Sequence, residues 1–475
     1  MSKSLKSIFF AIIGIIGLLI LISVALFFFV DTSVYKSRLE RAASEALGME
    51  VHVGGQLGIT FIPGLHVRLD DVHIRNREMD VAAAKEASLE IALLPLLHKE
   101  VRIRRIGLQH PRISIKRDSD GKFNFEQPEN AKGTFHAPVL DHLSLTDGVF
   151  LYEDEQSGEG FEMSNFNLDV RGLRIAGGNS LPLLKNLSFT AEFACRDIRT
   201  KGLMFSDVKF TCKGKDGSFA LNPVTMRLFG GQGSGSIVAN FSGPIPHYSV
   251  RSSLAKFQIE EYFKTLSSKK VAEGSMDFSA SLSMRGNTTK EIIQTAGGNV
   301  TLRGENLTLY GNDLDREFSR FESSQNFNLV DVGAFLFAGP IGLAVTKGYN
   351  FASIFRGSGG SSSIGKLFSD WKVERGIAQA RDVAMATKQN RIALKGRINF
   401  VDERFDDVTI ALIDARGCAR VQQKIRGPFQ KLVVEKPSVL MSLAAPPLNL
   451  LKQARDLFTN GTCKVFYTGS VQAPK

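Results

Sequence analysis

The sequence predicts a mainly β protein in which one transmembrane helix precedes an antiparallel sheet and a few short helices. Two patterns and the composition support this fold class. A single long uncharged run lies near the start, from Ile8 to Val30, and apolar residues recur at every second position through most of the chain that follows. The chain also contains 44 glycines and 35 phenylalanines but one tryptophan, which is typical of many short strands joined by turns.

The uncharged run predicts a membrane anchor. At ~1.5 Å rise per helical residue, its 23 residues span about 35 Å, enough to cross a ~30 Å hydrocarbon core. The alternative is a cleaved signal peptide, whose apolar region is typically ~7–15 residues long and ends in small residues. Because this run is longer and closes on Phe27, Phe28 and Phe29, we expect an uncleaved anchor. Its orientation stays open, since basic residues flank the run on both sides: Lys3, Lys6, Lys36, Arg38 and Arg41.

Size and charge limit what the rest of the chain can be. Its 475 residues exceed the ~250–300 that one compact core supports, so we expect several cores or one extended core. The formal charge is +11, but acidic residues are mixed with the basic ones and no predicted helix carries a Lys/Arg stripe, which argues against nucleic acid as a partner. Attraction to anionic lipid headgroups is the better interpretation of this positive charge.

A short helix is predicted directly after the anchor. Asp31 or Ser33 can cap its start, apolar residues share one side of the segment from Tyr35 to Leu47, and Gly48 stands where a C-terminal cap belongs. A lid over one end of the following sheet is the favoured interpretation, ahead of a helix that binds the lipid surface by itself.

From Gly54 onward the apolar period changes to two, and one apolar face per strand indicates antiparallel sheet. The predicted strands carry Leu57, Ile59 and Phe61; Val67 and Leu69; Leu89, Ile91 and Leu93; Val101 and Ile103; Ile113 and Ile115; Leu143 and Leu145; Phe166, Leu168 and Val170; Phe189 and Phe193; Val208 and Phe210; Phe278 and Leu282; Val300 and Leu302; Ile392 and Leu394; Ile410 and Leu412. Helices are expected at residues 259–266, 288–295, 313–322 and 439–458, and a flexible Gly/Ser linker at 356–363.

The four cysteines predict a disulfide rather than a metal site. None lies in a CxxC pair or at metal-ligand spacing from a histidine. In an oxidising compartment Cys418 is expected to pair with Cys463, because both open strand-like runs late in the chain. For Cys195 and Cys212 two alternatives stay open, because a hairpin turning near Lys201 would not align them and two buried free thiols fit equally well.

A basic cluster lies beside one predicted strand and consists of Lys99, Arg102, Arg104 and Arg105. Val101 and Ile103 would point to one face of the strand while Arg102 and Arg104 point to the other. A solvated strand face is one interpretation, and contact with phospholipid headgroups is the second.

No enzyme, cofactor or metal site is expected. The segment from Gly360 to Lys366 satisfies the GxxxxGK part of a phosphate-binding loop, but Leu367 stands where such a loop needs a Ser or Thr hydroxyl for magnesium. The eight histidines do not stand at metal-ligand spacing, and the sequence contains no Ser/His/Asp grouping in the context of nucleophilic catalysis.

Behind the anchor, the short predicted helix leads into a hairpin with a Phe-x-Pro element and an Asp-Val pair, with defining residues Gly48, Gly55, Phe61, Pro63, Leu69, Asp71 and Val72. This block, residues 31–76, resembles the start of AsmA-family proteins. The next block, residues 88–126, is similar to the family's second element, with matches at Pro95, Leu96, Leu97, Ile103, Ile106, Pro111, Ile113, Gly121, Asn124 and Phe125. Residues 373–471 resemble the family's C-terminal region, while the middle of the chain matches only in style.

The resemblance implies a bitopic inner-membrane protein of Gram-negative envelopes, with its bulk in the oxidising periplasm and a connection to outer-membrane assembly. Larger relatives are similar to bridge-like lipid transporters, so an elongated, curled antiparallel sheet that forms a groove is expected; the chain is short for a member that crosses the whole periplasm. The expected divisions are a cytoplasmic tail (1–7), the anchor (8–30), an N-terminal AsmA-like region (31–150), a middle β region (151–310) and a C-terminal AsmA-like region (311–475).

Two functions stay open. Under the resemblance, the protein is non-enzymatic and shelters phospholipid acyl chains in an apolar groove, with the inner membrane and phospholipid as partners. Alternatively the same apolar faces close on one another as a dry core, and the protein is a structural or assembly scaffold for outer-membrane proteins, with outer-membrane assembly proteins as partners. The expected groove residues are Leu57, Ile59, Phe61, Val67, Leu69, Leu89, Ile91, Leu93, Val101, Ile103, Ile113 and Ile115.

Overall fold

The computed structural model of the chain is built mainly from β-strands with a few short helices, as the sequence predicts. It describes residues 32–60, 64–76, 79–92, 103–126, 140–175, 183–265, 269–311, 313–316, 318, 359–436, 438–439 and 465–474. The chain divides into two compact units, Met1–Ala220 and Leu221–Lys475, called unit 1 and unit 2 below. Among the described helices none is long and apolar enough to cross a membrane, and the expected anchor at residues 8–30 lies outside the described residues.

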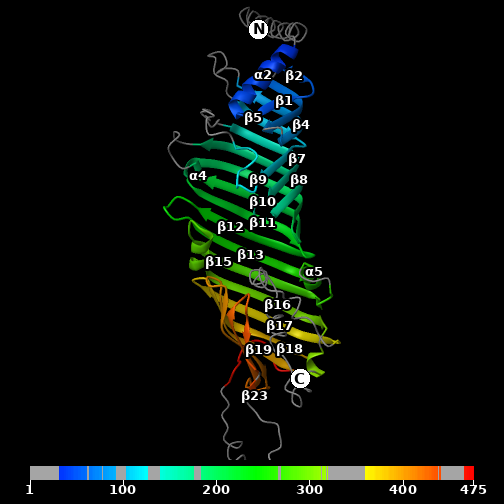
Figure 1. Ribbon diagram of the computed structural model, residues 1–475, viewed down its shortest axis with the longest axis vertical. Helices are drawn as coiled ribbons and strands as arrows, with labels where there is room; N and C mark the ends of the chain where they lie inside the picture. Colours follow the sequence, from blue (N-terminus) through cyan, green and yellow to red (C-terminus); the bar gives the residue numbers. More distant parts are fainter. Residues whose placement is uncertain are drawn as a thin grey trace, which may run out of the picture. The chain divides into compact units, whose positions relative to one another are not determined.

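The elements follow one another as hairpins along most of the chain (Figure 1). Unit 1 contains α2 (Thr32–Leu47), β1 (Glu50–Val53), β2 (Leu57–Thr60), β3 (Leu65–Asn76), β4 (Met79–Ile91), β5 (Ile103–Gln109), β6 (Arg112–Arg117), β7 (Leu140–Asp154), β8 (Glu159–Ile175), α4 (Leu183–Asn186), β9 (Leu187–Thr200) and β10 (Leu203–Lys215). The boundary between the units falls within β11 (Ser218–Leu228). Unit 2 contains β12 (Gly231–Asn240), β13 (His247–Gln258), α5 (Ile259–Lys264), β14 (Ala272–Glu273), β15 (Ser275–Arg285), α6 (Thr289–Thr295), β16 (Gly297–Tyr310), β17 (Ser361–Glu374), β18 (Ile377–Thr387), β19 (Arg391–Asn399), β20 (Arg404–Ile413), β21 (Ala419–Pro428), β22 (Val433–Val434) and β23 (Ser438–Val439).

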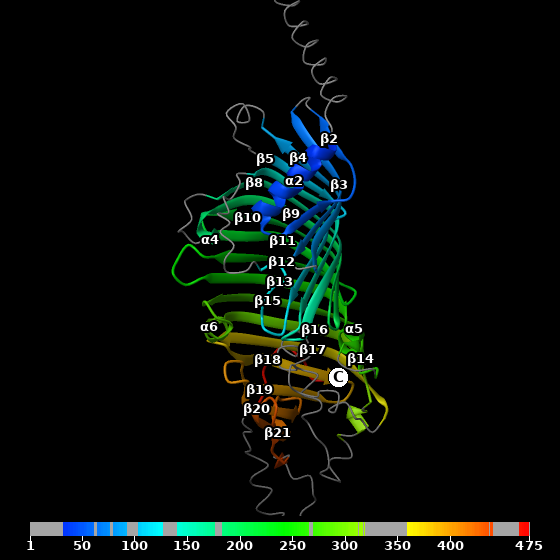
Figure 2. The same cartoon turned by 45° about the horizontal axis from the view of Figure 1, so that its top comes forward.

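Helix α2 ends where the sequence predicts. Gly48 has φ +65°, a left-handed conformation that glycine adopts without steric cost, and its N–H donates to the carbonyl of Ser44 at 2.8 Å. The helix lies against β1 and β2 (Figure 2), and Leu39 packs against the buried cluster that contains Val53 and Leu57. The favoured interpretation of this helix as a lid over the first strands is therefore confirmed.

The lid also satisfies the outer edge of β1. On its inner edge β1 pairs with β3, and on its outer edge the N–H of Val53 donates to Glu40 Oε1 at 2.8 Å and the N–H of Val51 donates to Ser44 Oγ at 2.8 Å. A strand edge with unpaired N–H groups is a template for wrong pairing. Two helix side chains therefore close this edge without another strand.

Glu40→Ala should destabilise the fold by about 1–3 kcal/mol, because the substitution leaves the N–H of the fully buried Val53 without an acceptor. Glu40→Gln keeps an oxygen at the same place and should recover most of the loss. Urea unfolding of the purified chain, followed by circular dichroism, measures both. Equal midpoints for Glu40→Ala and wild type would show that α2 does not close this edge.

The sheet is mixed, which corrects the expectation of a purely antiparallel one. β5 and β6 lie end to end and both run parallel to β7, whereas most other strand pairs are antiparallel. Parallel neighbours need a connection of roughly a dozen residues or more, and residues 118–139 stand between β6 and β7 in the sequence. Alternation of period two is the same for either direction, so the sequence pattern does not report this reversal.

Single residues in the left-handed conformation interrupt three strands of unit 1. Asp147 in β7, Asn165 in β8 and Asp207 in β10 have φ of +53°, +52° and +52°. Asp and Asn tolerate this conformation better than other side-chain-bearing residues. At Asn165 the apolar positions change parity, from Met163 before it to Phe166 after it, so the bend keeps apolar side chains on one face of β8.

Gly148 lies beside one of these bends because the ring of Phe166 fills the space of a side chain. A Cβ at Gly148 would lie 2.4 Å from a ring carbon of Phe166, so Gly148→Ala should destabilise the chain by about 1–3 kcal/mol through overpacking. Gly58→Ala is the control, since its Cβ would meet nothing closer than 3.8 Å. Thermal unfolding that ranks the two variants equally would contradict this account.

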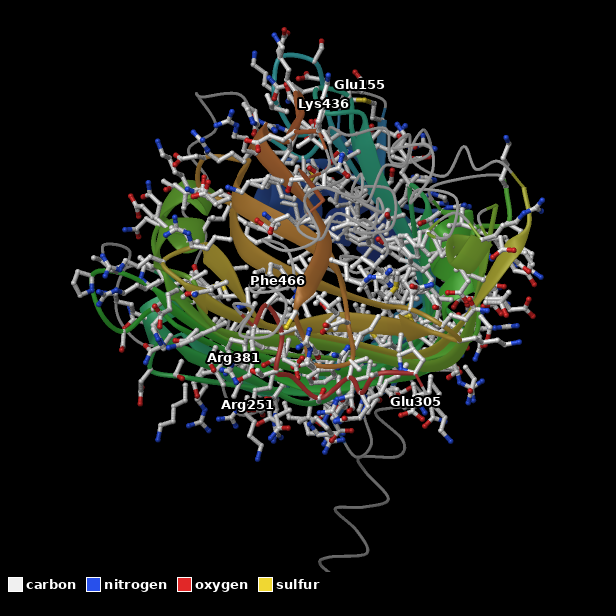
Figure 3. All side chains as sticks on the ribbon, turned by 90° about the horizontal axis from the view of Figure 1, so that it is seen from below. Glu155, Arg251, Glu305, Arg381, Lys436 and Phe466 are labelled. Atoms are coloured by element: carbon white, nitrogen blue, oxygen red, sulfur yellow. The ribbon has the colours of Figure 1, made fainter. Side chains whose placement is uncertain are left out.

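The core of unit 2 lies on one face of its sheet and is fully packed. Trp371 is 1 % exposed, Ile392 and Ile410 are 0 % exposed, and the aromatic side chains of Tyr262 and Phe263 from α5 join them. The opposite, outer face carries charged side chains: Figure 3 shows the labelled side chains of Arg251, Glu305 and Arg381 on the outer side of the curved sheet.

Two predicted helices of unit 2 are confirmed, and the predicted linker is partly wrong. α5 and α6 occupy the expected places, and Thr288 caps α6 by accepting from the N–H of Glu291 at 3.2 Å. Within the expected linker at 356–363, Ser361, Ser362 and Ser363 instead begin β17 and pair with β16. Ser362 is 4 % exposed and its Oγ accepts from the N–H of Leu314, so backbone pairing and burial override the flexible composition. The predicted helix at 439–458 lies outside the described residues, except that Val439 belongs to β23.

Candidate functional site

Two continuous rows of apolar side chains cross the strands of unit 1. Residues directly opposite in a ladder point to the same face, so their registers define the rows. We call the two rows together the apolar ladder. The first row is Ile59, Val67, Leu89, Ile106, Leu143, Val170, Ala191 and Cys212; the second is Leu57, Leu69, Ala87, Leu108, Leu145, Leu168, Phe193 and Phe210.

The start of the apolar ladder is covered and the remainder is partly open. Under α2, the side chains of Leu57, Val67 and Leu69 are only 8 %, 6 % and 5 % exposed. From β5 onward many members are half-buried: Ile106, Leu108, Leu143, Leu168, Phe193 and Phe210. A half-buried apolar row with no covering element among the described residues is a surface on which another apolar molecule can lie.

Aromatic rings line the open part of the ladder. Phe193 and Phe210 stack across β9 and β10 with ring centroids 4.7 Å apart, and Phe166 stacks on Phe193 at 6.4 Å. A second aromatic group lies farther along β7 and β8, where Phe161 contacts Phe150 at 5.6 Å and Tyr152 at 5.5 Å. Such offset stacks leave ring faces available to hydrocarbon.

The expected groove residues fall on this surface or beside it. Leu57, Ile59, Val67, Leu69 and Leu89 are members of the apolar ladder. Two further pairs adjoin it: Ile91 pairs with Ile103, and Ile113 and Ile115 lie opposite Phe150 and Tyr152. Phe61, Leu93 and Val101 lie outside the described residues.

The basic cluster is held by carboxylates. Arg105 Nε lies 3.3 Å from Glu90 Oε2 and Arg104 Nε lies 3.1 Å from Asp141 Oδ2, while both arginine side chains remain more than half exposed. Arg105 precedes Ile106 in β5, so it points to the face opposite the ladder. Lys99 and Arg102 lie outside the described residues, and contact of this cluster with headgroups stays a prediction.

The aromatic half of the ladder was not among the expected groove residues. Phe193 and Phe210 stood in the sequence as members of two strands separated by a turn, and nothing in the period placed them opposite each other. The turn at Lys201 and Gly202 is the signal that could have predicted this pair. Phe193 and Phe210 lie equally far from the turn, so a two-residue hairpin places them opposite each other.

A family comparison identifies the chain. The AsmA family model matches residues 1–180 and 184–324, more than half of the sequence. The chain belongs to the AsmA family. Curated proteins and solved structures gave no match in the same comparisons.

The extent of the AsmA match differs from what the motifs predicted. The resemblance of residues 31–76 and 88–126 lies inside it, and so does most of the middle of the chain, which resembled the family only in style. The match ends at residue 324, so it does not include the late segment 373–471. The apolar ladder, which ends at Cys212, lies wholly within the matched part.

The cysteines of this AsmA-family chain divide into two kinds. Cys418 is disulfide-bonded, and its expected partner Cys463 lies outside the described residues. Cys195 and Cys212 are free, because the register places Cys195 opposite Val208 and Cys212 opposite Ala191. Burial raises the pKa of both free thiols. Within the described residues, no group of three or more His, Cys, Asp or Glu side chains could hold a metal ion.

Alkylation should report this burial. Cys195 and Cys212 are 2 % and 8 % exposed, and a raised thiol pKa leaves less of the reactive thiolate at neutral pH. Both should therefore react with iodoacetamide at least about tenfold more slowly in the folded chain than in urea. Met204→Cys, at a position 48 % exposed on β10, is the control that should react quickly in both. Equal rates for all three thiols in the folded chain would contradict the placement.

Proposed function

We propose that the protein is a non-enzymatic, inner-membrane-anchored periplasmic protein of envelope biogenesis that holds or passes phospholipid acyl chains along the apolar ladder. The observation that carries the proposal is the pair of unbroken apolar rows, with one residue of each row on every strand from β2 to β5 and from β7 to β10. AsmA-family membership supports the envelope setting.

The dimensions suit an acyl chain. From β5 through β7, β8 and β9 to β10 there are four strand spacings, so the open part of the ladder is roughly 19 Å long at ~4.8 Å per spacing. One leaflet contributes about 15 Å of the ~30 Å hydrocarbon core of a bilayer. Each methylene that moves from water to an apolar surface gains ~0.8 kcal/mol, so a tail lying along the ladder avoids most of the cost of leaving the bilayer.

The ladder needs no catalytic or charged group to hold an acyl chain. Its members are aliphatic and aromatic side chains with one buried thiol, and the polar groups of the same strands point to the opposite face, as Glu192 and Lys209 do. A tail can therefore slide from one strand to the next without meeting a charge. An anchor at residues 8–30 would keep this surface next to the membrane that supplies the lipid.

A scaffold role is the second candidate, and the packing of unit 2 favours it. There the side chains of Ile392, Val408 and Ile410 are 0 % exposed, so this part of the core is dry and closed. A closed core leaves the outer surface and the edges of the sheet for partners such as outer-membrane assembly proteins.

Site-specific photocrosslinking tests the proposal in membranes. Benzoylphenylalanine in place of Phe193 or Phe210 should give phospholipid adducts, detected by mass spectrometry, at least severalfold more often than at Glu192 or Lys209. These control positions neighbour the first two in sequence but are exposed on the opposite face.

The same experiment separates the two candidates. Equal lipid labelling from both faces would mean that the ladder does not hold acyl chains. Protein adducts from Phe193 and Phe210, without lipid, would instead favour the scaffold, because the apolar face would then be a protein interface.

A further inference from the structure

Residues 465–474 lie on the outer face of unit 2, opposite its core, as an irregular segment with a bend at Gly469 and Ser470. We call this segment the C-terminal strap. It covers a floor of alanines on β18, β19 and β20, called the alanine seat: Ala384, Ala386, Ala393 and Ala411. Tyr467 and Val471 of the strap are 6 % and 0 % exposed there, and three of the four alanines are 0 % exposed.

The alanine seat has room for a segment of polypeptide. On the opposite face of the same strands stand Met385, Ile392 and Ile410, which fill the core, whereas the outer face carries methyl groups at the corresponding places. Small side chains let another backbone approach a sheet closely. The seat therefore leaves room for the rings of Phe466 and Tyr467, which a floor of larger residues would exclude.

Specific polar contacts hold the strap in one register. Asp382 accepts from the hydroxyl of Tyr467 and, at 2.9 Å, from the N–H of Ser470. Arg391 Nη1 donates to the carbonyl of Val471 at 3.0 Å, and its guanidinium lies 5.6 Å from the ring centre of Tyr467. These contacts engage one aromatic hydroxyl and two backbone positions, so the seat recognises both a side chain and the backbone of the strap.

A disulfide-bonded cysteine lies beside the start of the strap. Cys418 is disulfide-bonded, and its backbone forms an isolated antiparallel β-bridge with that of Val465, the first residue of the strap. Of the four cysteines Cys195 and Cys212 are free, and Cys463 stands two positions before the strap in the sequence. A bond at this position raises the effective concentration of the strap at its seat.

We propose that the alanine seat is a peptide-recognition site for the C-terminal strap, and that the Cys418 disulfide latches the strap there in an oxidising compartment. Reduction by a dithiol breaks the S–S bond, each sulfur gains one electron and one proton, and the dithiol closes into its own disulfide. The strap then leaves the seat. Seating of the strap is thus coupled to the redox state of the compartment, independently of what the apolar ladder binds.

Hydrogen exchange with mass spectrometry tests the latch on the full chain. In the oxidised protein, amides of the strap such as Val471 should be protected; after reduction with dithiothreitol, or in Cys418→Ser, they should exchange at least about tenfold faster. The amides of β19 should be unchanged, which shows that the sheet itself is intact. Strap protection that is equal before and after reduction would overturn the latch.

A matched pair of variants tests recognition by the seat. With the disulfide intact, Asp382→Asn should speed exchange of the strap about tenfold, because this carboxylate accepts two hydrogen bonds from it. Asp370→Asn is the control: Asp370 lies on the same outer face but binds Arg381 and Thr301, not the strap. Identical strap exchange in the two variants would mean that the seat does not recognise the strap and that only the disulfide holds it.

Discussion

Cross-strand register is the constraint on which this protein depends. A slip of one residue between neighbouring strands sends every side chain to the other face, and the chain has one apolar residue to place at each step of the ladder. The pairing of Leu168 with Phe193 and of Phe193 with Phe210 aligns residues that lie 42 positions apart in the sequence, counted from 168 to 210. Without that register there would be scattered apolar side chains rather than a continuous surface.

The same register explains the unusual backbone positions. In a long strand that alternates strictly, a bend would send the apolar side chains that follow it to the opposite face of the sheet. Residues such as Asn165, in the left-handed conformation, return those side chains to the apolar face. Asp147 has the same backbone conformation in the neighbouring strand β7, and its N–H donates to Asn167 Oδ1 at 3.1 Å. Polar residues within these strands are therefore part of what keeps the apolar face continuous.

Both units have a sheet with one apolar face, but they cover that face differently. In unit 1 the lid α2 covers the beginning of the apolar ladder and leaves half-buried aromatic rings farther along. In unit 2 the apolar face is packed to full burial, and it is the opposite face, floored by alanines, that receives another segment of the chain. Whether a sheet face binds something is thus decided by the size of its side chains and by what already covers it.

Several elements could be derived from the sequence because local chemistry determines them. The helix before Gly48 follows from its cap, α6 follows from Thr288 and Glu291, and the apolar face of each strand follows from the period of two. Much of the candidate site also followed, since Leu57, Ile59, Val67, Leu69 and Leu89 needed only that alternation.

Other features were decided only by the tertiary structure. The parallel pairing of β5 with β7, the strand that begins at Ser361 and the meeting of Phe193 with Phe210 all depend on backbone hydrogen bonds, which carry no side-chain signature. The sequence by itself determined that each strand has an apolar face and which residues form that face. Which strands adjoin, and whether their faces are covered, came from long-range pairing, because period and composition describe a strand but not its neighbour.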